Sequence, residues 1–106
     1  MKIKKSVVRV RVRRGIQFLN ARVSGWHTKI DLRKLNMDAI TECIGGQVSG
    51  SYGQFLAEYL ISGSRAVAYG FMVPQSIPSN DRFDRYCESL TQCWREEIKK
   101  LDATRV

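Results

Sequence analysis

One amphipathic segment near the C-terminal end most constrains how this chain can fold. From Ser79 to Leu101, apolar side chains recur every three or four residues, the spacing that places them on one face of an α-helix. They are Phe83, Tyr86, Cys87, Leu90, Cys93, Trp94, Ile98 and Leu101. Such a helix spans about 30 Å at 1.5 Å per residue, so the other segments of this short chain must pack against its apolar face. Ser79 or Asn80 can cap its start.

Glu97 is the charged side chain that falls within this apolar face, near Tyr86. Two interpretations are open. Its carboxylate reaches solvent at the rim of the core, or it lies partly buried and pairs with an arginine. The second arrangement is structural more often than functional.

A second pattern, at residues 6–13, predicts a β-strand. Valines at 8, 10 and 12 alternate with arginines at 9, 11 and 13, and β-branched residues in strict alternation are typical of strands. A lone strand is not stable, so we expect it to pair with residues 66–73, with residues 28–32, or with the same strand of a second molecule in a homodimer. Arginine at every second position also protects a sheet edge from aggregation.

The remaining segments read as short helices and turns. We expect helices over residues 16–23, from Asp38 to Val48, and over 51–61, with a turn-rich connector at 26–37 packed on the core; residues 64–69 fit a helix or a strand. Gly45 and Gly46 weaken the second helix by about 1 kcal/mol each, which is tolerable where another element packs very close. The prediction is an α-rich α+β fold in one domain, 1–106: a basic arm or strand at 1–14, a helical core at 15–101 and a polar tail at 102–106.

The formal net charge of +8 belongs entirely to the N-terminal third. Residues 1–30 hold nine Lys or Arg and no acid, whereas residues 31–106 hold nine basic and ten acidic residues. This asymmetry indicates contact with nucleic acid or an acidic partner, or a solubilising edge. Alternate residues of a β-strand lie about 6.6–6.8 Å apart, which is close to the spacing of phosphates along a nucleic-acid strand. The candidate binding residues are Lys2, Lys4, Lys5, Arg9, Arg11, Arg13 and Arg14.

No pattern in the chain indicates a catalytic or metal site. His27 is the single histidine, and Asp31 lies four residues on, but no nucleophile signature surrounds Cys43, Cys87 or Cys93. A zinc site is not expected, because no C-x-x-C or H-x-x-x-H pair is present. We therefore expect no enzymatic activity, no cofactor and no metal.

The glycine-rich stretch 45–53 precedes a predicted helix, the setting of some phosphate-binding turns. It lacks the Lys and Ser/Thr of a P-loop. The favoured interpretation is a tight turn where two helices approach closely, and a nucleotide-binding loop is the alternative.

The chain lacks signals for export or for membrane insertion. No apolar run approaches the ~20 residues of a membrane span, and no secretory signal follows the basic N-terminus. Three cysteines, an odd number, argue against a disulfide framework. These features predict a protein of the reducing cytoplasm that has no membrane partner.

An ordered series of short motifs runs through roughly residues 15–101: Gly25-Trp26, Lys29-Ile30-Asp31-Leu32, Leu35-Asn36-Met37, Glu42-Cys43-Ile44, Gly46-Gln47, Gly50-Ser51-Tyr52, Gly70-Phe71, Leu90-Thr91, Trp94-Arg95 and Ile98. In this series the chain resembles a family of small proteins from bacteriophages and prophages, especially those of actinobacteria. The chain departs from the pattern at Gly45, where the family has a larger residue, and in its basic N-terminal arm. No activity or catalytic residue comes with the family.

The resemblance implies a phage-encoded accessory protein in the bacterial cytoplasm. The first hypothesis is a non-enzymatic protein that binds a host or phage macromolecule, such as an antagonist of a host defence component. The alternative is a nucleic-acid-binding accessory protein that acts through the basic strand. A nucleotide-binding protein and a minor virion component are further possibilities.

Overall fold

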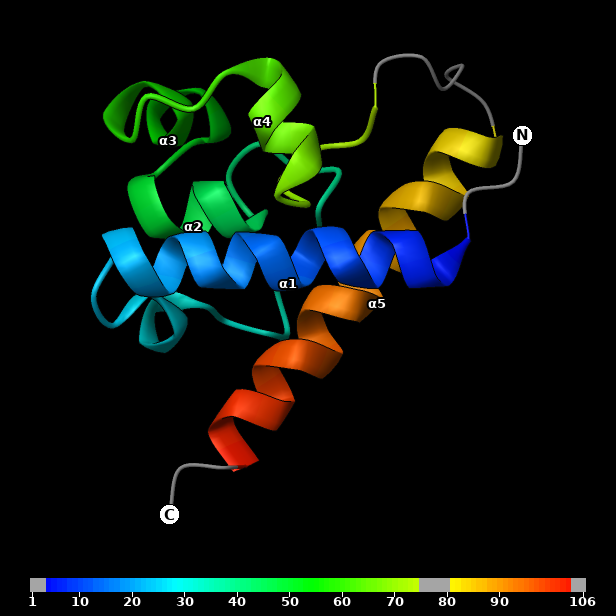
Figure 1. Ribbon diagram of the computed structural model, residues 1–106, viewed down its shortest axis with the longest axis horizontal. Coiled ribbons are helices and arrows are strands. Elements are labelled where there is room, and N and C mark those ends of the chain that lie inside the picture. Colours follow the sequence, from blue (N-terminus) through cyan, green and yellow to red (C-terminus); the bar gives the residue numbers. More distant parts are fainter. Residues whose placement is uncertain (1–3, 75–80, 104–106) are drawn as a thin grey trace.

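The computed structural model describes residues 4–74 and 81–103, and these residues form a helical domain (Figure 1). Two long helices, α1 (Lys5–Arg22) and α5 (Asp81–Ala103), cross each other. Between them in sequence come the 3₁₀ turn η1 (Trp26–Lys29) and three short helices, α2 (Ile44–Ser49), α3 (Tyr52–Glu58) and α4 (Gly63–Ala68). The described ranges contain no strand, so the predicted α+β class is wrong and the fold is all-α. None of the described helices is long and apolar enough to cross a membrane.

The predicted strand at 6–13 instead lies in the first half of α1. The prediction was wrong because, over so short a segment, the same apolar positions fit both a strand and a helix. Val8 and Val12, four residues apart, are buried, whereas Val10 between them is 47% exposed. A strand would have placed all three valines on the same side. The buried side of the helix continues through Ile16, Leu19 and Val23. Residues 5–14 of the expected arm are thus continuous with the expected helix at 16–23, and the strand that was expected to pair, within the chain or with a second molecule, is absent from the described residues.

Helix α5 confirms the C-terminal prediction. Its buried apolar side chains are Tyr86, Cys87, Leu90, Cys93, Trp94 and Ile98, with Phe83 and Leu101 partly buried against the same core. The proposed caps at 79 and 80 lie outside the described residues. Asp102 and Ala103, expected in the polar tail, belong to the helix, and the rest of the expected tail lies outside the described residues.

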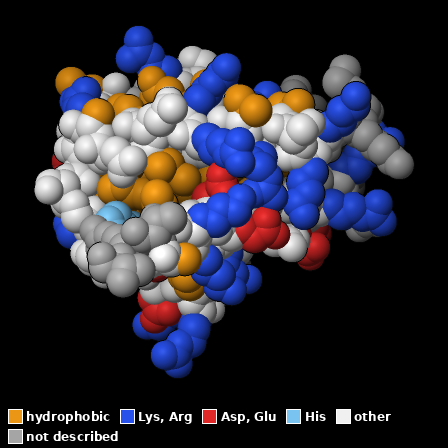
Figure 2. All heavy atoms as spheres, turned by 60° about the horizontal axis from the view of Figure 1, so that its bottom comes forward, with side chains coloured by type: hydrophobic (Ala, Val, Ile, Leu, Met, Phe, Trp, Pro, Cys, Tyr) orange, Lys and Arg blue, Asp and Glu red, His pale blue; other side chains and the backbone are white. Residues whose placement is uncertain are grey.

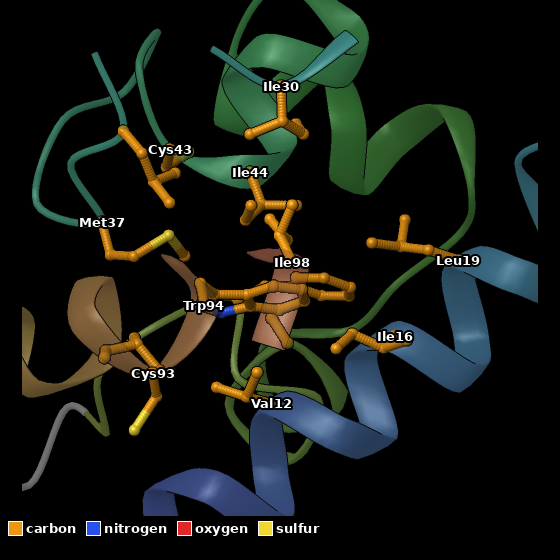
Figure 3. Close-up of a cluster of buried hydrophobic side chains, with 14 of the residues drawn as sticks. Val12, Ile16, Leu19, Ile30, Met37, Cys43, Ile44, Cys93, Trp94 and Ile98 are labelled. Atoms are coloured by element: carbon orange, nitrogen blue, oxygen red, sulfur yellow. The ribbon is translucent and has the colours of Figure 1, made fainter. Parts of the chain in front are cut away.

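Trp94 occupies the centre of the core (Figure 3). Its ring stacks on Phe71 at 5.7 Å and meets Trp26 edge to face at 6.2 Å between ring centroids. The indole Nε1 donates a hydrogen bond of 2.7 Å to the carbonyl oxygen of Gly70, so the polar atom of this buried side chain is satisfied. Figure 3 shows side chains of α1 on one side of the ring and Met37 and Ile44 on another.

Two glycines allow the backbone of α1 to contact the backbone at the end of α4 directly. A Cβ atom at Gly15 would overlap the carbonyl oxygen of Tyr69 and lie 2.9 Å from the Trp94 ring. Gly70 adopts φ +70 where α4 ends, and a Cβ there would lie 3.0 Å from the backbone nitrogen of Val12. Both sites require glycine, one for space and the other also for its left-handed conformation.

The predicted turn-rich connector is confirmed, and side chains of α5 fasten it to the core. Trp26, Ile30, Leu35 and Met37 are buried. Arg95 donates hydrogen bonds to the carbonyl oxygens of Leu32 and Leu35, at 3.2 and 3.3 Å. The Thr91 hydroxyl accepts a 2.9 Å hydrogen bond from the backbone N–H of Met37.

The middle of the chain is helical with shifted boundaries. The helix expected from Asp38 begins only at Ile44, where the Sγ atom of Cys43 accepts a 3.2 Å hydrogen bond from the N–H of Gly46. The helix expected at 51–61 is α3, which ends at Glu58, and a separate helix, α4, begins at Gly63. The ambiguous segment 64–69 is therefore helical.

Candidate nucleic-acid interface

Helix α1 carries six cationic side chains and no acidic one over its 18 residues. At about 100° per residue, its exposed surface divides into three strips. One flank carries Arg9 and Arg13. The opposite flank carries Arg11 and Arg22, with Lys4 just before the helix. Between the flanks lies an outward row, Ser6, Val10, Arg14, Gln17 and Ala21, all exposed to solvent.

On the first flank, Arg9 and Arg13 bind the carboxylate of Glu97 from α5. The Nε of Arg13 donates to Glu97 Oε1 at 2.6 Å, and Arg9 Nη1 lies 3.5 Å from Oε2. Lys100 Nζ lies 3.0 Å from the same Oε2 atom. The Glu97 side chain is only 7% exposed. Of the two interpretations of Glu97, the buried carboxylate paired with arginine is confirmed.

These ion pairs keep the carboxylates of Glu96 and Glu97 charged. Burial by itself raises the pKa of Glu97, but the hydrogen bonds from Arg13 and Lys100 outweigh burial, and the pKa lies below its ordinary value. Arg9 also donates a 2.7 Å hydrogen bond to Glu96, which lowers the pKa of that carboxyl. Three cations therefore face two anions here, and an excess positive charge remains.

On the opposite flank, neutral partners position the arginines. Arg11 Nη1 donates a 2.7 Å hydrogen bond to the hydroxyl of Tyr86. The guanidinium carbon of Arg22 lies 5.7 Å from the centre of the Phe18 ring. Neither contact neutralises a charge.

The structure separates residues that the strand interpretation had aligned. A strand would place Arg9, Arg11 and Arg13 in one line, whereas the helix puts Arg11 on the flank opposite the other two. Lys4, Lys5 and Arg14 are exposed and form no ion pair within the described residues. Lys2, the remaining candidate, lies outside the described ranges.

The surface of α1 stays strongly cationic after its ion pairs are counted. The ion pairs of this surface, among the described residues, are with Glu96 and Glu97, which leaves six positive charges from eight cations: Lys4, Lys5, Arg9, Arg11, Arg13, Arg14, Arg22 and Lys100. Figure 2 shows Lys and Arg side chains gathered toward the N-terminal end of α1, with acidic side chains among them. The ion pairs with α5 could not be read from spacing along the sequence, because 84 to 88 residues separate their members.

The opposite side of α5 has a different character. An open groove of about 820 Å³ runs along this helix, and its charged lining residues are Asp38, Asp84, Glu88, Arg95, Lys99 and Glu96, the last of which is also the ion-pair partner of Arg9. Carboxylates outnumber cations in this lining. The molecule is thus electrostatically two-sided, and a polyanion would approach it from α1.

The other candidate sites show structural roles. All three cysteines are buried with unbridged thiols, and burial raises the pKa of each. For Cys87 the pKa reaches about 12, with the charges of Asp38 and Asp84 adding to burial. Thiols in this state are poor nucleophiles and poor metal ligands. Within residues 4–74 and 81–103, no three His, Cys, Asp or Glu side chains are arranged to hold a metal ion.

The single histidine lies close to the end of α5. His27 Nδ1 lies 3.7 Å from Oδ1 of Asp102 at the end of α5. Asp31 instead accepts a hydrogen bond from the N–H of Arg33. No local pattern indicated Asp102, since 75 residues separate it from His27 in the sequence.

The glycine-rich stretch is a site of close helix packing. A Cβ atom at Gly45 would lie 2.6 Å from the Phe55 ring, and one at Gly46 would lie 2.5 Å from the carbonyl oxygen of Ile40. The favoured interpretation, a tight approach of two helices, is confirmed. Both glycines are buried, so they present no open phosphate cradle.

Several residues that carry the phage resemblance hold the fold together. Trp94, Arg95 and Thr91 fasten α5 to the connector, and the Gln47 amide bonds to backbone atoms of Asp31 and Glu42. Comparison of the chain with protein-family models, curated proteins and solved structures finds no match.

Proposed function

We propose that this chain is an accessory protein of a bacteriophage that binds nucleic acid through α1 and catalyses no reaction. The observation that supports this proposal is the surface of α1, which has cations on both flanks and no acid of its own. Lys and Arg that neutralise phosphates release condensed counterions, and this release drives binding. The resemblance to phage proteins supports the setting.

The contacts of the flanking arginines support this role. Arg9, Arg11 and Arg13 are held by Glu96, Glu97 and Tyr86, so less side-chain freedom is lost when they meet a phosphate. A guanidinium has five N–H donors, so donors remain after these intramolecular bonds. Arg13 remains 58% exposed beside its carboxylate.

The choice of variant decides how clear the test is. Changing Arg9, Arg11 and Arg13 to alanine would also remove the contacts between α1 and α5. The better triple variant is Lys4→Ala, Lys5→Ala and Arg14→Ala, because these side chains make no ion pair among the described residues. The matched control is Lys29→Ala, Arg33→Ala and Lys34→Ala, which removes the same charge from exposed positions outside α1.

The measurement is fluorescence anisotropy with a labelled duplex of about 20 base pairs across a salt series. We expect the α1 triple variant to lose about tenfold or more in affinity at about 100 mM salt, and the slope of log K against log salt to fall by roughly two to three units. The control should lose far less. Equal losses in both variants, or no binding by the parent chain, would contradict the proposal.

A second candidate function is binding to a host or phage protein, for example as an antagonist of host defence. Leu60 favours it: the side chain is 83% exposed and its backbone adopts φ 54. An exposed leucine in a left-handed conformation has no stabilising role in the free chain, whereas a partner that covers it would bury apolar surface. A pull-down from infected cells separates the candidates. A partner retained after nuclease treatment but lost with Leu60→Gly supports protein binding, and loss on nuclease treatment alone supports nucleic acid.

A further inference from the structure

The outward row of α1 has a composition suited to contact with base edges. Ser6, Val10 and Ala21 are short, so the helix backbone can approach a surface closely. Arg14 and Gln17 are the two longer side chains of this row, and both are exposed. Arginine pairs with guanine, glutamine pairs with adenine, and apolar side chains contact the thymine methyl group in the major groove of DNA.

The cationic side chains on the two flanks of α1 are placed to meet the phosphate backbones on the two sides of such a groove. Arg9 and Arg13 lie about 100° and 60° from the centre of the outward row on one side, and Arg11 lies about 100° from it on the other, with Lys4 and Arg22 at about 120°. A helix about 10–12 Å wide fits a major groove about 12 Å wide, with a phosphate backbone along each side. α1 also lies across the front of the molecule, with α5 crossing behind it (Figure 1).

From these observations we propose that α1 enters the major groove of duplex DNA, with the outward row facing base edges and the two flanks facing phosphates. The inference rests on the proposed nucleic-acid function and names its target. Duplex RNA fits less well, because the major groove of an A-form helix is deep and narrow.

Single strands fit less well because α1 offers no free aromatic surface. Proteins that bind unpaired bases stack them on exposed aromatic rings. Phe18, the aromatic residue of α1, is half-buried, stacks on Tyr69 at 5.0 Å and lies under the guanidinium of Arg22. The acidic lining of the groove along α5 also disfavours phosphate on the other side of the molecule.

The test compares three labelled probes of one sequence at one salt concentration: duplex DNA, duplex RNA and single-stranded DNA. The key variant is Gln17→Glu, which places a carboxylate in the centre of the outward row. Its matched control is Gln54→Glu, the same change at an exposed glutamine of α3. Circular dichroism verifies that both variants keep the helical content of the parent chain.

We expect the parent chain to bind duplex DNA about tenfold or more tightly than the other probes, and Gln17→Glu to lose about tenfold on duplex DNA. Gln54→Glu should change the affinity by less than about twofold. Equal affinity for duplex DNA and duplex RNA, or equal effects of the two variants, would overturn groove entry and leave nucleic-acid binding in place. Absence of binding to all three probes would overturn the proposed function itself.

Discussion

Replacing Glu97 with glutamine tests the electrostatic contact that joins α1 to α5. The side chain keeps its shape and loses its charge. Three cationic groups then lose their shared anion: Arg13 at 2.6 Å, Lys100 at 3.0 Å and Arg9 at 3.5 Å. Hydrogen bonds to charged groups contribute about 1.5–3 kcal/mol each in favourable settings.

The loss should be smaller than for a fully buried ion pair. Breaking such a pair costs about 3–5 kcal/mol because a buried charge is left alone. Here the remaining cations reach water, since the side chains of Arg13 and Lys100 are 58% and 63% exposed. The glutamine oxygen can also still accept from Arg13. We therefore expect Glu97→Gln to lower the free energy of unfolding by about 1–2 kcal/mol at neutral pH.

This contribution should depend on pH with a defined sign. The pKa of Glu97 is lowered in the folded state, so its carboxylate stabilises the fold above the unfolded pKa of about 4.3 and loses this effect as the pH falls through the lower folded value. Urea unfolding at about pH 7 and pH 3, followed by tryptophan fluorescence, should show the difference between parent and variant shrinking in acid.

Glu42→Gln is the control, because Glu42 is exposed and makes no ion pair among the described residues. Its effect should stay within about 0.5 kcal/mol. If Glu97→Gln changes the free energy of unfolding as little as this control, or if its effect is the same at about pH 3 as at about pH 7, the charge of Glu97 does not stabilise the contact between α1 and α5.

Four further substitutions test the packing and the backbone conformation. Gly15→Ala should lower the free energy of unfolding by about 2 kcal/mol or more, because its Cβ would overlap the Tyr69 carbonyl oxygen; Gly63→Ala, with open space around it, should be neutral or stabilising by up to about 1 kcal/mol. Leu60→Gly should stabilise by about 1 kcal/mol, since glycine adopts positive φ without strain; a lower melting temperature would contradict this. Trp94→Ala should cost about 3–5 kcal/mol, and a loss below about 1 kcal/mol would show that α5 does not pack as described.

The long amphipathic helix was predictable because a strong pattern repeated over many turns. The eight residues at 6–13 satisfy both a strand and a helix pattern, and only their continuation through Ile16, Leu19 and Val23 distinguishes the two. Gly15 interrupted that continuation, since glycine usually ends or weakens a helix. Glycine is needed at position 15 because the backbone there closely contacts Tyr69, 54 residues away in the sequence.

The candidate site was predictable in its charge and not in its geometry. The concentration of cations in the first third is a property of the sequence alone. Which arginines pair with α5 depends on how two distant helices cross, and no local spacing contains that information. Glu97 was identifiable as an unusual residue because a carboxylate interrupted an apolar face. Its partners became evident only from the fold.

An NMR titration of the ¹⁵N-labelled chain with duplex DNA tests directly whether α1 binds DNA through its outward row. We expect the largest amide shift changes on this row, at Ser6, Val10, Arg14, Gln17 and Ala21, with smaller changes on the flanks of the helix. Changes concentrated along the acidic groove of α5 or around Leu60, or no changes at all, would contradict this expectation.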